Sequence, residues 1–373
     1  MSKPTKVVVV GAGAGGLATA ASLKRRGTAV TVLDAGSGVG QSWRERYDRL
    51  HLHTPRLQSG LPGRRISRRV GRWVARDDVA AYLEEYARHF EIEPTHDVRV
   101  DRIDRRDGGY TVKAGDRSWE ASHVVVATGY LRVPVVPPWP GEESFEGELV
   151  HASLYRSPAP YQDKRVMVVG TGNTGAEIAA DLAEQGAAEV WLSYRTPPHV
   201  IPRQLLGVPM TLIGFPNAYI PAALCDPVNG AIERMTMGKV RRHGLPRPTE
   251  GLKAQAVSSG VIPIIDVGLA DQLEAGRVTP VPAVESMGRT AVRLVDGRDI
   301  EVDAVIAATG YRRGLEDMVG HLGVLDDAGS PLCHAAETHE SAPGLHFIGM
   351  WLSLKGHLFQ MNRDARKIAR RIS

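Results

Sequence analysis

Two glycine-rich segments contain residues whose spacing is typical of phosphate binding: GAGAGG at 11–16 and GTGNTG at 170–175. The glycines at the fixed positions are Gly11, Gly13 and Gly16 in the first segment and Gly170, Gly172 and Gly175 in the second. In a GxGxxG turn the first glycine allows a tight bend, and the second lets the backbone approach a pyrophosphate. The third lets the following helix pack closely against the strand. The chemistry indicated is binding of dinucleotides, whose redox reactions belong to the bound group.

The elements around the first turn are those that a dinucleotide site requires. An apolar run predicts a buried strand before the turn, and an amphipathic pattern predicts a helix after it. The second strand ends in Asp34, eighteen residues after Gly16, where a carboxylate would bind ribose hydroxyls. The residues predicted to bind this nucleotide are Gly11, Gly13, Ala14, Gly15, Gly16 and Asp34.

The second turn has the same surroundings but a different strand end. Its second strand ends in Ser193, Tyr194 and Arg195 instead of an acid. A carboxylate would repel a 2′-phosphate, whereas a hydroxyl and a guanidinium would bind it, so this site is predicted to prefer NADPH to NADH. The alternative is that Arg195 is an ordinary surface arginine. The residues predicted to bind here are Gly170, Gly172, Asn173, Thr174, Gly175, Ser193 and Arg195.

Two further segments match each other, HVVVATGY at 123–130 and AVIAATGY at 304–311. Small residues after an apolar strand let the chain pass close to a bound cofactor or cross between domains. Because one copy follows each nucleotide unit, we predict an α/β fold with two Rossmann-like dinucleotide-binding domains, the NADPH domain inserted into the FAD domain. The predicted bounds are 1–160 and 284–373 for the FAD domain and 161–283 for the NADPH domain. The cofactor contacts predicted in these segments are Ala127, Thr128, Gly129, Thr309 and Gly310.

The number and spacing of the cysteines limit the kinds of redox centre that the chain can contain. Only Cys225 and Cys333 are present, far apart and without a CxxC, which argues against a disulfide framework and a dithiol centre. Two dinucleotides without a dithiol indicate a flavin that is reduced by NADPH and passes electrons to an acceptor other than a protein disulfide. Molecular oxygen is the leading candidate.

Composition sets the remaining bounds. Apolar residues make up 43% and charged residues 24% of the 373 residues, as in soluble globular proteins, and no run reaches the ~18 to 20 apolar residues of a membrane span. The N-terminus lacks a signal-peptide pattern, so cytoplasm is the expected location. The formal charge of +4 comes without a recognition motif, which argues against nucleic acid. The expected partners are a small-molecule substrate and O2, and a homodimer stays open.

The segment FEGELVHASLYR at 145–156 reproduces the FxGxxxHxxx(Y/F) signature between the two glycine turns. With it, the sequence resembles class B flavin-dependent monooxygenases over nearly its full length. YUCCA-type flavin-containing monooxygenases are the most similar in appearance, through WRERYDRLHLHTPR, YRTPPHVIPR and GHLFQMNRDARKIARRI. The related Baeyer–Villiger enzymes typically carry Trp followed by Pro or Asp where Tyr155 and Arg156 stand, so the flavin-containing branch is favoured.

The resemblance also implies roles for individual residues. It implies catalytic positions at His53, His151 and Tyr155, although 145–155 is equally interpreted as a structural hinge between the domains. His53 stands where many members place an Asn beside the flavin C4a atom, with His51 as the fallback candidate. Further flavin contacts are implied at Gln41, Trp43, Val98 and Gln360, although Gly40 is followed by Gln41 instead of the second Gly of the family's GGxW stretch.

The resemblance implies a cycle in which NADPH reduces the flavin, O2 forms a C4a-(hydro)peroxyflavin, and one oxygen atom enters a small hydrophobic amine, sulfide or 2-oxo acid. A Baeyer–Villiger enzyme acting on ketones and an NADPH-dependent flavin reductase or oxidase are the alternatives. The uncharged stretch 208–225 is interrupted by prolines. It is interpreted as a lid or apolar tunnel wall, a helix pair packed on the NADPH domain, or a dimer contact.

Overall fold

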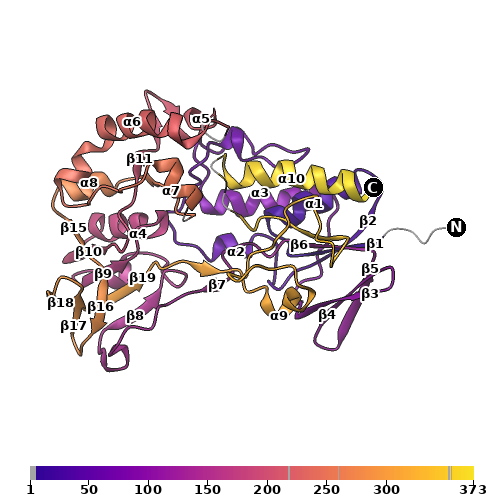
Figure 1. Cartoon of the computed structure of the whole chain (residues 1–373), viewed down its shortest axis with the longest axis horizontal. Coiled ribbons are helices and arrows are strands. Elements are labelled where there is room, and N and C mark those ends of the chain that lie inside the picture. The colour runs from indigo at the N-terminus through magenta and orange to yellow at the C-terminus, as the bar shows by residue number, and fades with distance from the viewer. Residues whose placement is uncertain (1–5, 217–218, 259, 352, 354) are drawn as a thin grey trace. The chain divides into compact units, whose positions relative to one another are not determined.

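A computed structural model describes residues 6–216, 219–258, 260–351, 353 and 355–373. The chain forms two compact units. Unit 1 comprises residues 1–45, 50–133 and 311–373, and unit 2 comprises residues 46–49 and 134–310. The elements of both are labelled in Figure 1.

Unit 1 is built on a parallel sheet with the strand order β2-β1-β6-β21. Its strands are β1 (Lys6–Val10), β2 (Ala29–Leu33), β6 (His123–Val126) and β21 (Leu345–Phe347). Along β1, Val7 and Val9 pack into one apolar cluster, whereas Val8 and Val10 pack into another. Both faces of the sheet are therefore covered, which explains the uninterrupted valine run.

Helices cover one face of this sheet and a small antiparallel sheet covers the other. The helices are α1 (Ala14–Lys24), α2 (Gln41–Arg44), α3 (Arg76–His89) and α10 (His357–Ile372), whereas the short helix α9 (Glu316–Val319) packs with the small sheet on the other face. The small sheet consists of β3 (Arg102–Arg106), β4 (Gly109–Ala114) and β5 (Arg117–Ala121). Helix α10, yellow in Figure 1, packs against α1, and its basic residues lie on the side away from the core.

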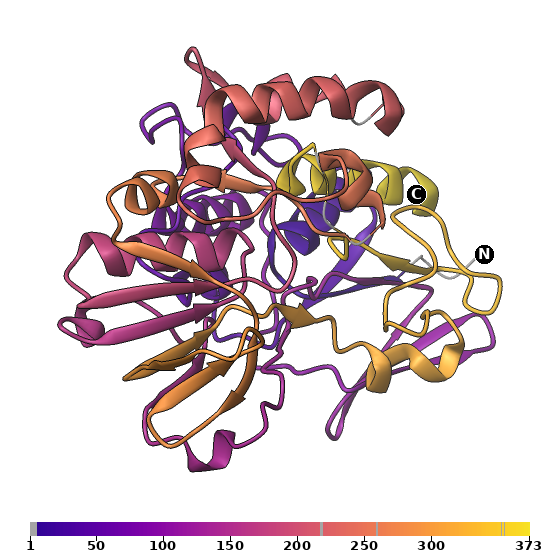
Figure 2. The ribbon, with the colours of Figure 1, turned by 60° about the vertical axis from the view of Figure 1, so that its left-hand side comes forward.

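Unit 2 contains a second parallel sheet with the strand order β15-β10-β9-β19-β8. Its strands are β8 (Glu148–His151), β9 (Arg165–Val169), β10 (Glu189–Ser193), β15 (Val278–Val281) and β19 (Ala304–Ala307). Helix α4 (Asn173–Glu184) packs against β9 and β10. The antiparallel strands β16 (Val284–Met287), β17 (Ala291–Leu294) and β18 (Asp299–Glu301) pack against Met167 and Val169 of β9, and Figure 2 shows them beside the main sheet. The α/β prediction is thereby confirmed in both units.

The predicted domain range 161–283 lies inside unit 2 but is narrower than it. The difference arises from strand pairing that is distant in sequence. Strand β19 pairs with β9 on one side and with β8 on the other, so residues on both sides of 161–283 complete the same sheet. Residues 46–49 also belong to unit 2, although the residues that flank them belong to unit 1.

The rest of unit 2 is mainly helical. It contains β11 (Val200–Pro202), β12 (Gln204–Leu205), β13 (Val208–Pro209), α5 (Met210–Ile213), α6 (Ala222–Arg242), α7 (Leu252–Ser258), β14 (Ile264–Asp266) and α8 (Leu269–Glu274). Pro221 precedes α6, and basic residues fill its last turn, where they face the negative end of the helix dipole. The stretch 208–225 contains strand β13 of the β12–β13 hairpin, the short helix α5 and the first turn of α6. Asn217 and Ala218 lie outside the described residues.

Candidate nucleotide-binding sites

The first glycine turn leaves no room for side chains at two of its three glycines. Gly11 has φ 109°, and a Cβ there would lie 2.6 Å from the Ala127 carbonyl oxygen. A Cβ on Gly16 would lie 1.8 Å from the Gly11 carbonyl oxygen. At Gly13, by contrast, no atom lies within 4 Å of the Cβ position. The turn is therefore closed by its outer glycines and open at its middle one, where a phosphate could approach the backbone.

The second turn repeats this geometry. Gly170 has φ 115°, and its Cβ position lies 2.4 Å from the Ala308 carbonyl oxygen. The Cβ position of Gly175 lies 1.9 Å from the Gly170 carbonyl oxygen, whereas Gly172 has open space within 4 Å. Each turn lies against the Ala-Thr-Gly segment of its own unit, which explains why this segment occurs twice in the sequence.

The helices that follow the turns offer unpaired amides. Helix α1 begins after Gly13 and α4 after Gly172, and neither has a side-chain cap or an acidic residue in its first turn. The first N–H groups of such a helix have no intrahelical acceptor and carry the positive end of the helix dipole. Both helix starts therefore fit the pyrophosphate of a dinucleotide.

Asp34 is held at the end of β2 by the turn itself. Its Oδ2 accepts a hydrogen bond from the Ala12 N–H at 2.6 Å, and its Oδ1 accepts one from the Gly36 N–H at 2.9 Å. The Val98 N–H donates to the Asp34 carbonyl oxygen at 2.9 Å, so the predicted adenine contact lies beside the same strand end. A carboxylate oxygen accepts more than one hydrogen bond, which leaves Asp34 able to accept from ribose hydroxyls.

Thr128 provides an independent indication that a ligand belongs in unit 1. Its hydroxyl is buried and has no hydrogen-bond partner among the described residues. It follows β6, directly after Ala127, whose carbonyl faces Gly11. Gly129 next to it has φ 78° and open space around its Cβ position. A buried hydroxyl without a partner costs free energy, and a bound FAD beside this turn would supply one, so the residues present fit the cofactor.

At the second site, the side chain of Ser193 is already bonded within the protein, whereas that of Arg195 can reach a ligand. Ser193 is 1% exposed, and its hydroxyl donates to the Pro282 carbonyl oxygen at 2.9 Å. Arg195 is exposed, and within the described part of the chain it has no ion pair. The guanidinium is therefore the group free to meet a 2′-phosphate, and the residues fit NADPH.

Other predicted residues of unit 2 already bind their neighbours. Asn173 donates to the Pro263 carbonyl oxygen at 3.3 Å and accepts from the Ile265 N–H at 2.8 Å. The Thr174 side chain hydrogen-bonds Tyr47, and the Thr309 hydroxyl donates to the Val135 carbonyl oxygen. These side chains hold the turn in place, while backbone groups remain for the nucleotide.

The 145–155 motif is explained largely by packing. A Cβ on Gly147 would lie 2.4 Å from the Phe145 ring and 2.8 Å from the Asp303 carbonyl oxygen, so only glycine fits. His151 is 5% exposed; its Nε2 donates to the Gly310 carbonyl oxygen, and its Nδ1 accepts from the Ser153 N–H, both at 3.0 Å. Burial lowers the pKa of His151, which favours the neutral ring.

Tyr155 is 1% exposed and ties the motif to α4. Its hydroxyl donates to Asp181 Oδ2 at 2.8 Å, and its ring lies 6.3 Å from the Tyr47 ring. Arg49 bonds the same helix, 2.6 Å from Glu184 Oε2. The motif thus anchors α4 together with 46–49, all within unit 2; a hinge between the domains and direct chemical roles for His151 and Tyr155 stay predictions.

The predicted flavin contacts of unit 1 lie on helices α2 and α10 and in the loop segments between them. Gln41 and Trp43 lie on α2, where the Gln41 amide donates to Glu45 Oε1 at 2.8 Å and Trp43 packs against the core. The Gln360 amide of α10 donates to Asp364 Oδ1 at 2.9 Å. His53 is half-buried, whereas His51 is exposed and pairs with Ala75 in an isolated bridge. Their contacts with flavin stay predictions.

Sequence reasoning missed a pair of rings in unit 1. The Tyr130 and His357 rings meet edge to face, 4.9 Å apart, and burial lowers the pKa of His357 to about 4. Tyr130 directly follows Gly129, and His357 begins α10. The signals were the tyrosine that ends ATGY and the histidine in GHLFQ.

Sequence reasoning also missed a buried charged group in unit 2. Glu177 of α4 is 4% exposed, and Tyr47, whose pKa is raised by burial and then by Glu177, hydrogen-bonds it. Burial lowers the pKa of Arg203 to about 10, while the charge of Glu177 opposes that shift. Tyr47 and Arg203 lie in WRERYDRLHLHTPR and YRTPPHVIPR, two segments that carry the family resemblance.

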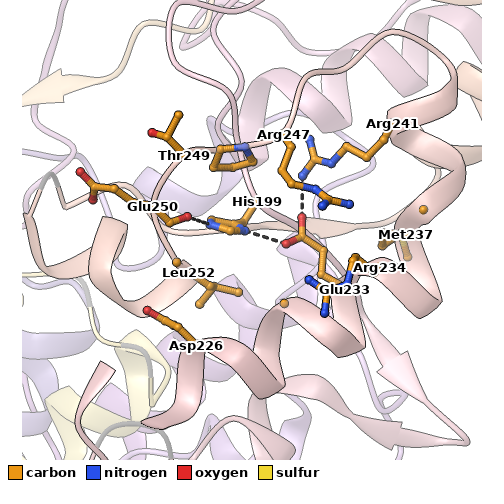
Figure 3. Close-up of a pocket in the computed structure, with 14 residues that line it drawn as sticks. His199, Asp226, Glu233, Arg234, Met237, Arg241, Arg247, Thr249, Glu250 and Leu252 are labelled. Atoms are coloured by element: carbon orange, nitrogen blue, oxygen red, sulfur yellow. Dashed lines mark hydrogen bonds and ion pairs between the residues drawn. The ribbon is translucent and has the colours of Figure 1, made fainter. Parts of the chain in front are cut away.

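A separate cavity of about 190 Å³ lies between α6 and residues 247–252. Figure 3 shows buried Glu233 between His199 and Arg241, accepting from His199 Nδ1 at 2.7 Å and from Arg241 at 2.5 Å. Arginines and carboxylates line the cavity in equal number. Because Glu233 is already paired, this group stabilises the packing of α6, and no cluster of His, Cys, Asp and Glu among the described residues is arranged to hold a metal.

The chain matches a family model described as pyridine nucleotide-disulphide oxidoreductase over residues 8–202. Among curated proteins, it is 33% identical to the "Probable indole-3-pyruvate monooxygenase YUCCA3" of Arabidopsis thaliana, covering 98% of this chain and 86% of the plant protein. It is 34% identical to the "Indole-3-pyruvate monooxygenase YUCCA1" of Oryza sativa subsp. japonica, covering 85% of this chain and 79% of that protein.

Solved structures agree on the fold. A variant of the flavin monooxygenase from Stenotrophomonas maltophilia superposes with a TM-score of 0.76 at 26% identity, covering 100% of this chain and 98% of that one. A cyclohexanone monooxygenase in its "Loose conformation" has a TM-score of 0.75 at 18% identity, covering 99% of this chain and 87% of that one. The second likeness concerns the fold alone.

Proposed function

Because the chain belongs to the class B flavin-dependent monooxygenases, enzymes that use FAD and NADPH, we propose that unit 1 binds the FAD and unit 2 the NADPH. In this proposal unit 2 is an insertion between residues 133 and 311 of unit 1. The observation that carries it is the pair of glycine turns of equal geometry, one followed by Asp34 and the other by Arg195.

The roles of the chain's own residues follow from this assignment. The open positions at Gly13 and Gly172 receive the two pyrophosphates, which accept hydrogen bonds from the first amides of α1 and α4. Asp34 accepts from the ribose of FAD, and Arg195 pairs with the 2′-phosphate of NADPH. Bound FAD supplies the redox centre that accepts hydride and reacts with O2.

We assign His151 and Tyr155 to positioning. Their hydrogen bonds to the Gly310 carbonyl oxygen and to Asp181 fix β8 and α4 within the NADPH unit, and with them the orientation of the bound nicotinamide. His53 is assigned to the reaction chamber, where its ring limits the loss of reducing equivalents as hydrogen peroxide.

The proposed substrate is a small hydrophobic 2-oxo acid. Support comes from the relatives, which are named indole-3-pyruvate monooxygenases and match 85% or more of this chain. The test is NADPH consumption with aromatic 2-oxo acids, amines, sulfides and ketones, with peroxide counted separately. Coupled consumption with the 2-oxo acids and loss of carbon dioxide supports the proposal. Coupled turnover only with sulfides, amines or ketones contradicts this substrate class while leaving the monooxygenase assignment intact.

Nucleotide preference is tested by Arg195→Ala. A charge-assisted hydrogen bond contributes about 1.5–3 kcal/mol, so the KM for NADPH should rise about 10- to 100-fold. The KM for NADH, which lacks the 2′-phosphate, should stay the same and serves as the internal control. Since Arg195 is exposed, the variant should fold normally. An unchanged KM for NADPH would remove Arg195 from the site.

A further inference from the structure

Helix α6 has two different apolar faces. The inner face buries Cys225, Met237 and Val240. On the outer face, Leu224, Val228 and Met235 are 68%, 59% and 84% exposed. These three positions lie on one line along a helix, since residues four and seven apart return to the same side. A helix that rested only on its own unit would carry polar residues along that line.

The inner face is held without help from the outer one. Buried Glu233 bonds His199, Arg241 and the Val200 N–H, as Figure 3 shows for the two side chains. Asp226 accepts from the N–H groups at the start of α7, at Lys253 and Ala254. The outer apolar line is therefore not explained by the packing of unit 2.

More exposed apolar side chains lie next to this helix. The tip of the β12–β13 hairpin carries Leu206, which is 96% exposed, and α5 carries Leu212 and Ile213. Figures 1 and 2 both draw this hairpin and α5 beside α6. We call residues 206–213 together with the outer line of α6 the α6 surface. Such a concentration of exposed apolar groups marks an interaction site.

The segment around α6 has a surplus of basic residues. Residues 203–253 contain seven Lys and Arg against three Asp and Glu, and one of the seven, Lys239, pairs with two acids of α8. Two of the acids, Asp226 and Glu233, are bound internally as described above. Arg242 is exposed seven residues after Met235, on the side of the apolar line, and exposed Arg234 lies between this line and the cavity. The α6 surface is therefore apolar and cationic together.

We propose that the α6 surface binds the surface of an anionic lipid bilayer. Apolar groups at the headgroup boundary, flanked by arginines that meet lipid phosphates, are the chemistry of peripheral attachment. A second copy of the chain fits less well, because a symmetric contact would bring the same positive charges together. No helix within the described residues is long and apolar enough to cross a bilayer, so the attachment is to the surface.

The experiment is co-sedimentation of the full-length, FAD-loaded protein with vesicles. Vesicles of phosphatidylcholine mixed with phosphatidylglycerol should bind the protein, and pure phosphatidylcholine vesicles should bind it at least tenfold more weakly. Added salt should weaken the binding, since it screens the headgroup charge. Equal binding to both vesicle types, or none to either, overturns the proposal.

Paired variants locate the contact. R234Q/R242Q should weaken binding by about fivefold for each charge removed, and L224Q/M235Q by about tenfold or more. The controls of the same type are R68Q/R69Q and V295Q/L332Q, which change exposed residues elsewhere and should bind as the unaltered protein does. Every changed side chain is exposed, and thermal unfolding verifies that each variant folds.

Two further results would contradict this assignment. Control variants that lose binding as much as the α6 variants would place the contact elsewhere. A dimer by light scattering that L224Q/M235Q dissociates, in a protein that ignores vesicles, would make the α6 surface a contact between copies. Neither result bears on the proposed monooxygenase activity, which is measured without lipid.

Discussion

The second and third glycines of the NADPH turn, Gly172 and Gly175, should respond differently to the same added methyl group. In Gly175→Ala the Cβ would lie 1.9 Å from the Gly170 carbonyl oxygen, a rigid backbone atom. Either the turn opens or α4 moves away, and overpacking of this kind costs about 1–3 kcal/mol. The expected effect is a Tm lower by roughly 2–10 °C, with weaker NADPH binding as a consequence.

In Gly172→Ala the methyl group meets no protein atom within 4 Å, and φ of −84° suits any residue. The Tm should therefore stay the same. The methyl group would instead occupy the space assigned to the pyrophosphate and remove one of its charge-assisted hydrogen bonds, worth about 1.5–3 kcal/mol. The KM for NADPH should rise about 10- to 100-fold, while FAD stays bound.

Thermal unfolding and steady-state kinetics with NADPH measure both effects. Gly238→Ala is the matched control, since this helical glycine also has open space within 4 Å and belongs to the same unit. It should leave the KM for NADPH unchanged. A Gly172→Ala protein with the KM of the unaltered enzyme would refute the placement of the pyrophosphate at the open position of this turn.

Three further predictions concern buried and half-buried groups. Tyr155→Phe removes the hydroxyl that donates to Oδ2 of buried Asp181, whose Oδ1 keeps its bond from Gln185, and should cost about 1–3 kcal/mol in urea unfolding; an unchanged unfolding free energy would exclude the hydrogen bond as an anchor. Burial holds the pKa of His346 and of His357 at about 4, below the ordinary 6.5. Between these two pH values the unfolded chain therefore binds more protons than the folded chain. Stability is therefore full above pH 6.5 and falls by up to about 3 kcal/mol per histidine as the pH drops to about 4, which urea midpoints across that range measure; a flat profile contradicts it. His53→Ala should raise the fraction of NADPH electrons recovered as hydrogen peroxide, and an unchanged fraction would remove His53 from the reaction chamber.

The parts of the fold that sequence predicted are local ones. The units β1–α1–β2 and β9–α4–β10 were predicted because turn, strand and helix signals follow one another within about 30 residues. Asp34 and Arg195 were placed by the same local spacing. The structure adds that both turns close against an Ala-Thr-Gly segment, at Ala127 and Ala308.

The parts that sequence did not predict depend on contacts between distant residues. The bounds of unit 2 follow from the pairing of β19 with β9, more than 130 residues earlier. The partner of Tyr155 is Asp181, a buried acid that looks like a surface residue of an amphipathic helix. Leu224 and Met235 are likewise exposed because buried Glu233, bonded to Arg241, holds the opposite face of α6 inward.

In the function proposed above, the two turns hold an FAD and an NADPH that react with each other. The most direct measurement is the visible flavin absorbance of the purified chain during anaerobic titration with NADPH and, in parallel, with NADH. We expect a yellow protein whose absorbance is bleached by stoichiometric NADPH, far more slowly by NADH, and restored by air. A protein that takes up no FAD when supplied with it, or whose bound FAD is not bleached by NADPH, would contradict it.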